Sequence, residues 1–495
     1  MKKVKNGKIT GLSKLGYGMG EVTFGCANTI LSVYLLITLT DYLKINPVWA
    51  SVIVVIGIIW DAFSDPIIGW LSDNSGGKFG RRRRYLLFYA IPLGIMFFLL
   101  WMFPTVLLGG SEAVKIIVVL GVYLCVITLL TLVNVPYGSI ILEMTDDYDE
   151  RTSLTSFRMV CSAFATLGSI FIADTLLGEQ PVAQAGDKLI YVGIVFGIVL
   201  TVTSLLCFGG TFERRKFIKP AKRPPFNFKK YVLESWKSKP FRQVTIAYLC
   251  AFTVIGLLQT LLQYYATYWL RTPNLFVIMA GMVLLVAILS TPLWVGISKK
   301  FGKKNTFLAS CLLAVVSLIG IFFIQPLYGG DAVLSMEESL AYMPTFGYVF
   351  ITLLGVGVGG VQLMPFSMMP DAINFSMKDG DMDEGAYYGI VTFVQKVGMG
   401  AATMLIGPVL SLANYTAPYD GWEANKLFIQ PHQSANDAIH WMFVALSIVV
   451  VIIGALAVLT YKIDKNALQN RIGGQRETLD VEIPNVEDLP PEAVV

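Results

Sequence analysis

Long apolar runs follow one another along the chain and are separated by short polar segments. Each run comes close to the roughly 20 residues that an α-helix needs to cross the hydrocarbon core of a bilayer. The pattern predicts an all-α polytopic membrane protein with twelve transmembrane helices. Their expected ranges are 14–42, 46–72, 83–104, 114–143, 155–178, 189–212, 243–269, 274–298, 305–326, 344–369, 386–412 and 437–462.

Composition also points to a membrane protein. Of the 495 residues, 55% are hydrophobic and 15% are charged. A soluble domain carries about 25% charged residues. The basic start has neither a compact apolar core nor a small-residue cleavage site, so we expect the first apolar run to be retained as a helix.

Cysteines and histidines form no catalytic or metal-binding pattern. The six cysteines all fall within apolar runs, none in a Cys-x-x-Cys pair, which is typical of small buried side chains. The two histidines, His432 and His440, lie at or beside one late loop. We therefore expect neither a histidine-based metal site nor a histidine-activated nucleophile in the core.

Basic residues gather at the N-terminus and at alternate connections. KKVKNGK lies near the start, KFGRRRR occupies 78–84, SKKFGKK occupies 298–304, and 213–242 is rich in Lys and Arg. The connections 104–113 and 327–344 contain neither residue. The positive-inside rule therefore predicts an integral plasma (inner) membrane protein with both termini in the cytoplasm. Topology and lipid headgroups account for the net charge of +4, so no nucleic-acid partner is expected.

Two sequence echoes predict an internal repeat. KFGRRRR follows the second expected helix and KKFGKKN the eighth, while PYGSIILEMTDDYDER and MPFSMMPDAINFSMKDGDMDEG close the fourth and the tenth. Paired halves are typical of transporters with a site near the midplane. We expect an N-terminal six-helix half at 1–212, a basic cytoplasmic linker at 213–242, a C-terminal six-helix half at 243–462 and a disordered cytoplasmic tail at 463–495.

Two aspartates stand inside the second apolar run, in WDAFSDP. Asp61 and Asp65 are four residues apart and so share one helix face. An ionised aspartate at bilayer depth costs on the order of 2.5–3.5 kcal/mol. A proton or a hard metal ion such as Na⁺ between the two carboxylates offsets that cost. We predict a cation site here; the alternative is that Asp65 lies near the cytoplasmic end and is hydrated.

The fourth helix offers further cation ligands in LLTLVNVPYG. Thr131 and Asn134 are three residues apart on one face, and Pro136 frees a backbone carbonyl nearby. We predict that both side chains complete the cation site. The alternative is an ordinary hydrogen bond from each to a neighbouring helix.

Two basic residues also stand inside apolar runs. Arg158 lies early in the fifth helix and Lys396 in the middle of the eleventh, at matching places in the two halves. We expect both to face a central cavity, paired with the aspartates of the second helix or holding an anionic group of the substrate. Arg158 has the alternative of reaching the cytoplasmic interface. Glu21 in the first helix would pair with such a cation or join the site.

Charged residues on the cytoplasmic side form a candidate gate. Asp371 and Glu384 flank an acidic loop after the tenth helix, and Arg81 and Arg151 follow the second and fourth helices. We expect the acidic and basic groups to pair when the protein faces outward. The alternative is that this loop is simply solvated.

The chain resembles the glycoside–pentoside–hexuronide:cation symporters, the melibiose permease-like family of the major facilitator superfamily. The resemblance covers about residues 12–462 and is carried by YGMGE…LTDYL, IWDAFSDPIIGWLSD with KFGRRR, NVPYG, FR, MPDAI and VQKVG. It implies the major facilitator fold and cotransport of a sugar-like solute with Na⁺, Li⁺ or H⁺ by alternating access. It also implies that Asp61, Asp65 and Thr131 bind the cation, that Arg158 contacts substrate and that Lys396 lies near both.

The chain departs from the melibiose permease pattern where substrate contacts are implied. Gly25 and Asn134 replace aspartates, Gly138 replaces an aromatic residue, and Gln362 replaces a tryptophan. Loss of an acid near Arg158 would leave net positive charge in the cavity. That favours an anionic solute, such as a uronide or a sulfosugar, over a neutral galactoside.

The predicted function is a secondary active symporter that couples inward movement of Na⁺ or H⁺ to uptake of a small sugar-like solute, with no other cofactor. Trp60, Tyr34, Gly25 and Gln362 are further candidate substrate-binding residues. The alternative is a cation-coupled lysophospholipid carrier, since relatives that carry such lipids share these charges. No Gly-x-Ser-x-Gly, zinc-ligand spacing or phosphate loop supports a membrane enzyme, and a non-transporting sensor is disfavoured by the aspartates. We expect a monomer among membrane lipids.

Overall fold

The computed structural model describes residues 4–5, 8–75, 79–80, 82–145, 148–177, 186–212, 236–325, 336–376, 384–417, 430 and 432–461. This part of the chain is almost entirely helical. Short π-helical segments (η) continue three of the α-helices. The elements are β1 Val4–Lys5, β2 Lys8–Ile9, α1 Gly11–Ile37, η1 Thr38–Tyr42, α2 Pro47–Asn74, α3 Arg83–Phe88, α4 Ala90–Val106, α5 Glu112–Met144, α6 Tyr148–Leu177, α7 Lys188–Gly210, α9 Lys239–Tyr264, η3 Tyr265–Trp269, α10 Leu275–Phe301, α11 Lys303–Phe322, α12 Met336–Tyr342, α13 Thr345–Ser376, α14 Glu384–Leu412, α15 Gln433–Trp441, η5 Met442–Leu446 and α16 Ser447–Leu459.

Eleven helices in the described part of the chain are long and apolar enough to cross a membrane. The remaining expected helix, 83–104, is broken into α3 and α4 at Tyr89. Pro92 lies in the first turn of α4, and its ring would clash with the carbonyl of Phe88, where α3 ends. Because α4 alone has 17 residues, the count of twelve continuous spanning helices stays a prediction.

The internal repeat has a structural counterpart at the ends of the helices. After α2, Arg82 lies 3.4 Å from the carboxylate of Glu143 at the end of α5. After α10, Lys303 lies 2.7 Å from the carboxylate of Asp371 at the end of α13. Each cation follows closely on a glycine with positive φ, 96° in the first case and 82° in the second. The two echoes found in the sequence thus fold into the same local arrangement.

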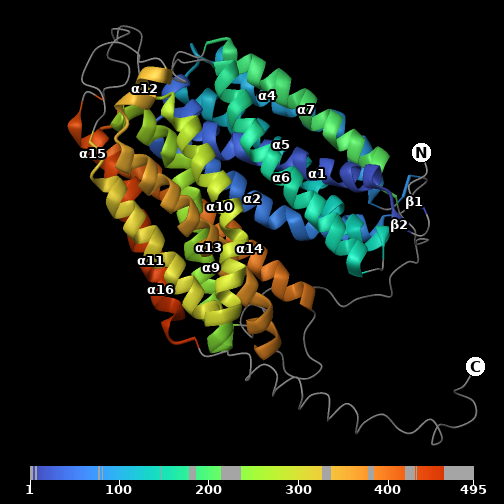
Figure 1. The fold of residues 1–495 in the computed structure, drawn as a ribbon. Helices are drawn as coiled ribbons and strands as arrows, with labels where there is room; N and C mark the ends of the chain where they lie inside the picture. Colours follow the sequence, from blue (N-terminus) through green and yellow to red (C-terminus); the bar gives the residue numbers. More distant parts are fainter. Residues whose placement is uncertain are drawn as a thin grey trace, which may run out of the picture.

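Two groups of helices lie side by side in Figure 1. Helices α1 to α7, drawn in blue to green, form one group, and α9 to α16, drawn in yellow-green to red, form the other. They pack against each other through α2 and α14, α1 and α9, and α6 and α10. The expected linker is described only at 236–242, and the expected tail at 463–495 lies outside the described residues.

The two membrane faces are named here from α1. The N-terminal side is the face where α1 begins, and the opposite side is the face where η1 ends; α12 and α15 lie toward the opposite side in Figure 1. On the opposite side α2 and α14 approach closely, because Gly407 of α14 lies directly against Ser51 and the backbone of Pro47. A side chain at position 407 would not fit between these helices.

Candidate cation and solute site

The two aspartates of α2 meet the lysine of α14 between the two groups of helices. Lys396 Nζ lies 2.7 Å from Asp61 Oδ2 and also donates to Asp65 Oδ2. The three side chains remain between 19% and 28% exposed. One ammonium therefore bridges two partly exposed carboxylates.

The predicted ligands of α5 stand beside this trio. Thr131 Oγ1 donates to Asp61 Oδ1 at 2.7 Å. Asn134 Oδ1 is buried and has no hydrogen-bond partner among the described residues. Carboxylate, hydroxyl and amide oxygens are ligands suited to hard cations. Among the described residues no group of three or more His, Cys, Asp or Glu is placed to hold a metal ion.

Arg158 does not join the aspartates of α2, contrary to one expectation. Its Nε donates to Glu21 Oε2 of α1 at 2.5 Å, and its guanidinium lies 5.3 Å from the ring centre of Tyr137. The side chain of Arg158 is 34% exposed, whereas that of Glu21 is 11% exposed. The alternative, that the guanidinium lies at the membrane interface, stays a prediction.

The charge balance of the site differs from the prediction. Asp61, Asp65 and Glu21 supply three carboxylates, and Lys396 and Arg158 supply two cations, so one formal negative charge remains when all are ionised. The prediction of net positive charge in the cavity is therefore wrong, because Glu21 supplies the acid that Gly25 lacks. A net negative site inside a membrane is stabilised by binding one monovalent cation.

Two of the further candidates lie on α1 and α2. Trp60 is 47% exposed, and its Nε1 donates to Thr128 Oγ1 at 2.9 Å. Gly25 is buried, and a Cβ added there would lie 3.1 Å from Ala165 Cβ of α6. Gly25 therefore allows α1 and α6 to pack closely, and its role in substrate binding stays a prediction.

The other two candidates lie on α1 and α13. The ring of Tyr34 is buried and meets Phe276 edge to face, and its hydroxyl has no partner among the described residues. Gln362 is exposed on α13. The roles of both residues in substrate binding stay predictions.

The candidate gate is described only in part. Asp371 pairs with Lys303 of its own group of helices rather than with an arginine of the other group. Arg81 and the side chains of Arg151 and Glu384 lie outside the described residues. Pairing across the two groups stays a prediction for another state of the protein.

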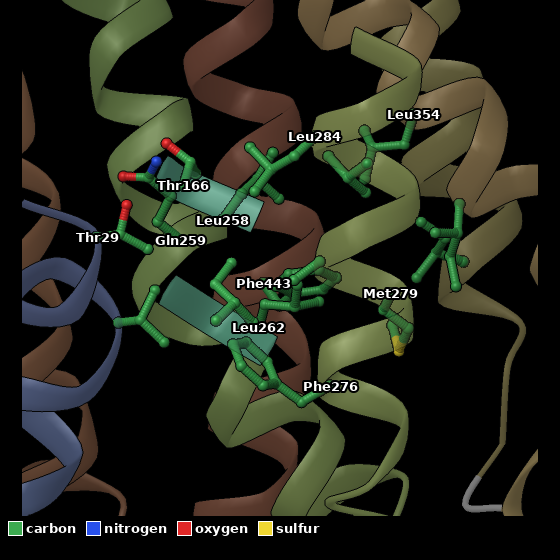
Figure 2. Close-up of a pocket in the computed structure, with 16 residues that line it drawn as sticks. Thr29, Thr166, Leu258, Gln259, Leu262, Phe276, Met279, Leu284, Leu354 and Phe443 are labelled. Carbon is green, nitrogen blue, oxygen red and sulfur yellow. The ribbon is translucent and has the colours of Figure 1, made fainter. Parts of the chain in front are cut away.

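A narrow apolar cavity lies between the two groups of helices. The cavity volume is about 50 Å³. Figure 2 shows the polar atoms of Thr29, Thr166 and Gln259 gathered at one end of it. Gln259 Oε1 is buried without a partner among the described residues. The rest of the wall is apolar, with Leu258, Leu262, Phe276, Met279, Leu284, Leu354 and Phe443 labelled in the view.

Sequence reasoning missed a buried carboxylate on the opposite side. Asp41 of η1 is 1% exposed and accepts hydrogen bonds from Thr40, Tyr268 and Tyr415. The only local signal is Thr-Asp-Tyr at the end of the first apolar run. The tyrosines come from distant helices, and no spacing in the sequence relates them to Asp41.

Comparison with known proteins gives consistent matches along nearly the whole chain. The profile of the family described as MFS/sugar transport protein matches residues 16–465. An isoprimeverose transporter from Lactiplantibacillus pentosus is 26% identical and aligns over 91% of this chain and 88% of its own. The sodium-dependent lysophosphatidylcholine symporter 1 of Mus musculus is 25% identical and aligns over 83% of this chain and 79% of its own.

A solved structure shares the fold. A bacterial homologue of the iron transporter ferroportin, 14% identical, superposes in its inward-facing state with a TM-score of 0.61 over 91% of this chain and 97% of its own. The outward-facing structure of that homologue superposes with a TM-score of 0.55 over 91% of this chain and 98% of its own. The shared structure confirms the predicted fold class, and the match to the family profile with its transporter relatives confirms a transporter rather than an enzyme.

Proposed function

Because the chain belongs to the MFS/sugar transport protein family, we propose that it is a symporter that couples entry of Na⁺ or H⁺ to uptake of a small sugar-like solute. It is an integral, multi-pass membrane protein. Under this proposal it works as a monomer in the plasma (inner) membrane, contacts only lipids besides its solute, and keeps both termini in the cytoplasm. The N-terminal side is then cytoplasmic and the opposite side faces outward.

The observation that carries the proposal is the bridge from Asp61 through Lys396 to Asp65. An ammonium between two carboxylates occupies the space that a bound cation needs. The Lys396 ammonium and a Na⁺ ion 4 Å apart would repel each other by about 4 kcal/mol at an effective dielectric constant of 20. Entry of Na⁺, held by Asp61, Asp65, Thr131 and Asn134, therefore displaces Lys396 from the carboxylates.

Displacement of Lys396 links the cation to the solute. The freed ammonium and the exposed edge of Arg158 then present donors to hydroxyl or carboxylate groups of a solute between the two groups of helices. The solute stabilises the displaced lysine, and the displaced lysine leaves the carboxylates to the cation. Each ligand therefore raises the affinity for the other, as coupling requires.

A second candidate function is a cation-coupled lysophospholipid carrier. The narrow apolar cavity favours it, because an unbranched alkyl chain fits such a space better than a hydroxyl-rich ring does. The sodium-dependent lysophosphatidylcholine symporter is among the relatives reported above. Both candidates use the same cation site and differ in the solute.

Thermal unfolding of the purified protein tests both candidates. Methyl β-D-glucoside, methyl β-D-glucuronide and lysophosphatidylcholine are compared, each with Na⁺ or with choline, in the wild type and in Asp61→Asn. We expect one solute class to stabilise the wild type only with Na⁺, and Asp61→Asn to remove that dependence. Asp187→Asn, at an exposed aspartate before α7, is the matched control. A solute effect that is unchanged by Na⁺ and by Asp61→Asn contradicts the Na⁺ site and leaves proton coupling or uncoupled transport.

A further inference from the structure

Asp41 lies in a closed shell of hydroxyl groups. Its Oδ1 accepts from Thr40 Oγ1 at 2.7 Å and from Tyr415 OH at 2.5 Å, and its Oδ2 accepts from Tyr268 OH. Tyr264 OH lies 2.8 Å from Thr40 Oγ1 and donates to it, because the proton of Thr40 points to Asp41. Hydrogen bonds to an ionised acceptor are about twice as strong as those between neutral groups.

The shell joins parts of the chain that belong to different groups of helices. Thr40 and Asp41 lie in η1, at the end of the first helix. Tyr264 and Tyr268 lie at the end of α9 and in η3, and Tyr415 follows α14. The rings of Tyr268 and Tyr415 meet edge to face with centres 5.6 Å apart. One carboxylate thus ties the first helix to two helices of the other group.

The two sides of this junction have the same backbone geometry. In η1 the amide of Leu43 donates to the carbonyl of Thr38 at 3.0 Å, and in η3 the amide of Leu270 donates to the carbonyl of Tyr265 at 2.9 Å. The next residue is left-handed in both, with φ of 58°. Short π-helical segments occur often at functional sites. Asp41 and Tyr268 occupy equivalent positions in these segments.

Asp41 and Tyr268 occupy equivalent positions and are in direct contact, and equivalent positions that touch each other must lie near the axis that relates the two halves. A bond between them is therefore sensitive to rotation of one half against the other, which is how such transporters alternate between states. All of these side chains are at most 8% exposed, so the junction is sealed. The charged side chains of the cation site are more open to solvent, with exposed fractions of 19–34%; Glu21, at 11%, is the exception.

We propose that Asp41, with Tyr268 and Tyr415, forms the outer gate of the transport cycle. This gate is closed while the cation site is open to the N-terminal side, and its two phenol bonds break to admit solute from the opposite side. The inference rests on the proposed alternating-access function, but it concerns residues outside the cation and solute site. It assigns Asp41 a role in closing the pathway and none in binding the coupling ion.

The test measures opening directly by double electron–electron resonance. Spin labels at Leu108 and Leu340, both exposed on the opposite side, report the separation of the two groups of helices there. Cys125, the exposed native cysteine, is replaced by Ser; the others are buried. The variants are Tyr268→Phe, Tyr415→Phe and the double change, each of which removes only hydroxyl oxygen. Tyr265→Phe is the matched control, because its hydroxyl lies 3.5 Å from Ile321 O of its own group.

We expect the double variant to raise the population with the longer distance, relative to the population with the shorter distance, by about tenfold or more. The reason is the loss of two hydrogen bonds to a charged acceptor. The control should leave the ratio unchanged. An unchanged distribution in a folded double variant, or an equal change in the control, overturns the proposal; if the double variant does not fold, the single variants give the same comparison. The distance measurement needs no solute or Na⁺. Its outcome is therefore independent of whether the proposed symport activity is found.

Discussion

Asp65 and Asp41 are both carboxylates inside the membrane-spanning part of one chain, yet their partners differ in kind. Asp65 shares a lysine ammonium with Asp61 and is 26% exposed at its side chain. Asp41 is 1% exposed and is held by hydroxyl groups. An ammonium on a long flexible stem is exchangeable for another cation, whereas a shell of rigid phenols holds its acceptor in one geometry. The first arrangement suits binding and release of an ion, and the second suits closing a pathway.

The largest effect is expected from Asp61→Asn. One of two carboxylates around the cation is neutralised, and the attraction lost is about 4 kcal/mol at 4 Å with an effective dielectric constant of 20. Na⁺ affinity should therefore fall about 100-fold or more, as measured by Na⁺ titration of thermal stability. Asp41→Asn should leave Na⁺ affinity within a few-fold of the wild type, and equal losses in the two variants would remove the distinction between the two carboxylates.

A sharper test of the ionic site is Lys396→Met. It removes the ammonium that competes for both carboxylates, so Na⁺ should bind about tenfold more tightly or better, while coupled uptake into proteoliposomes is lost. Lys303→Met is the control, since Lys303 pairs with Asp371 outside the site. Weaker Na⁺ binding in Lys396→Met would mean that the lysine supports the cation instead of competing with it.

Packing on the opposite side is tested by Gly407→Ala. The added methyl group would collide with Ser51 and with the backbone of Pro47, and overpacking of this kind costs about 1–3 kcal/mol. The midpoint of thermal unfolding should fall, and the spin-label distances should shift toward the open arrangement. Gly281→Ala is the control, because a Cβ there meets nothing within 4 Å. Equal midpoints for the two variants would contradict the close contact of α2 with α14.

The smallest effect is expected from Glu21→Gln. It leaves the shape of the site but removes the charge that holds Arg158, so an anionic group gains a free cation. The affinity for methyl β-D-glucuronide relative to methyl β-D-glucoside should rise several-fold, and competition binding measures the ratio. Glu112→Gln, outside the site, is the control. An unchanged ratio would show that Arg158 does not select the charge of the solute.

Much of the cation site was predictable from residue types and spacing. Asp61 and Asp65 are one helical turn apart, so any helix over this run places both on one face. Thr131 was found through its motif, and it does bond Asp61. The pairing of Glu21 with an embedded cation was also expected and is confirmed, but the sequence did not show that this cation is Arg158, 137 residues away, rather than Lys396. The break at Tyr89 was also missed, since hydropathy does not register a proline in the first turn of a helix.

The sequence by itself determined the membrane-spanning class, most of the helix boundaries and the set of embedded charges. These are local properties, since hydropathy and helical periodicity act over about 20 residues. Only the tertiary structure decided which acid meets which base. Lys396 meets Asp65 across 331 residues, and Tyr415 meets Asp41 across 374. Such pairs depend on how distant helices pack, so the same residues yield an exchangeable ion site in one place and a sealed junction in another.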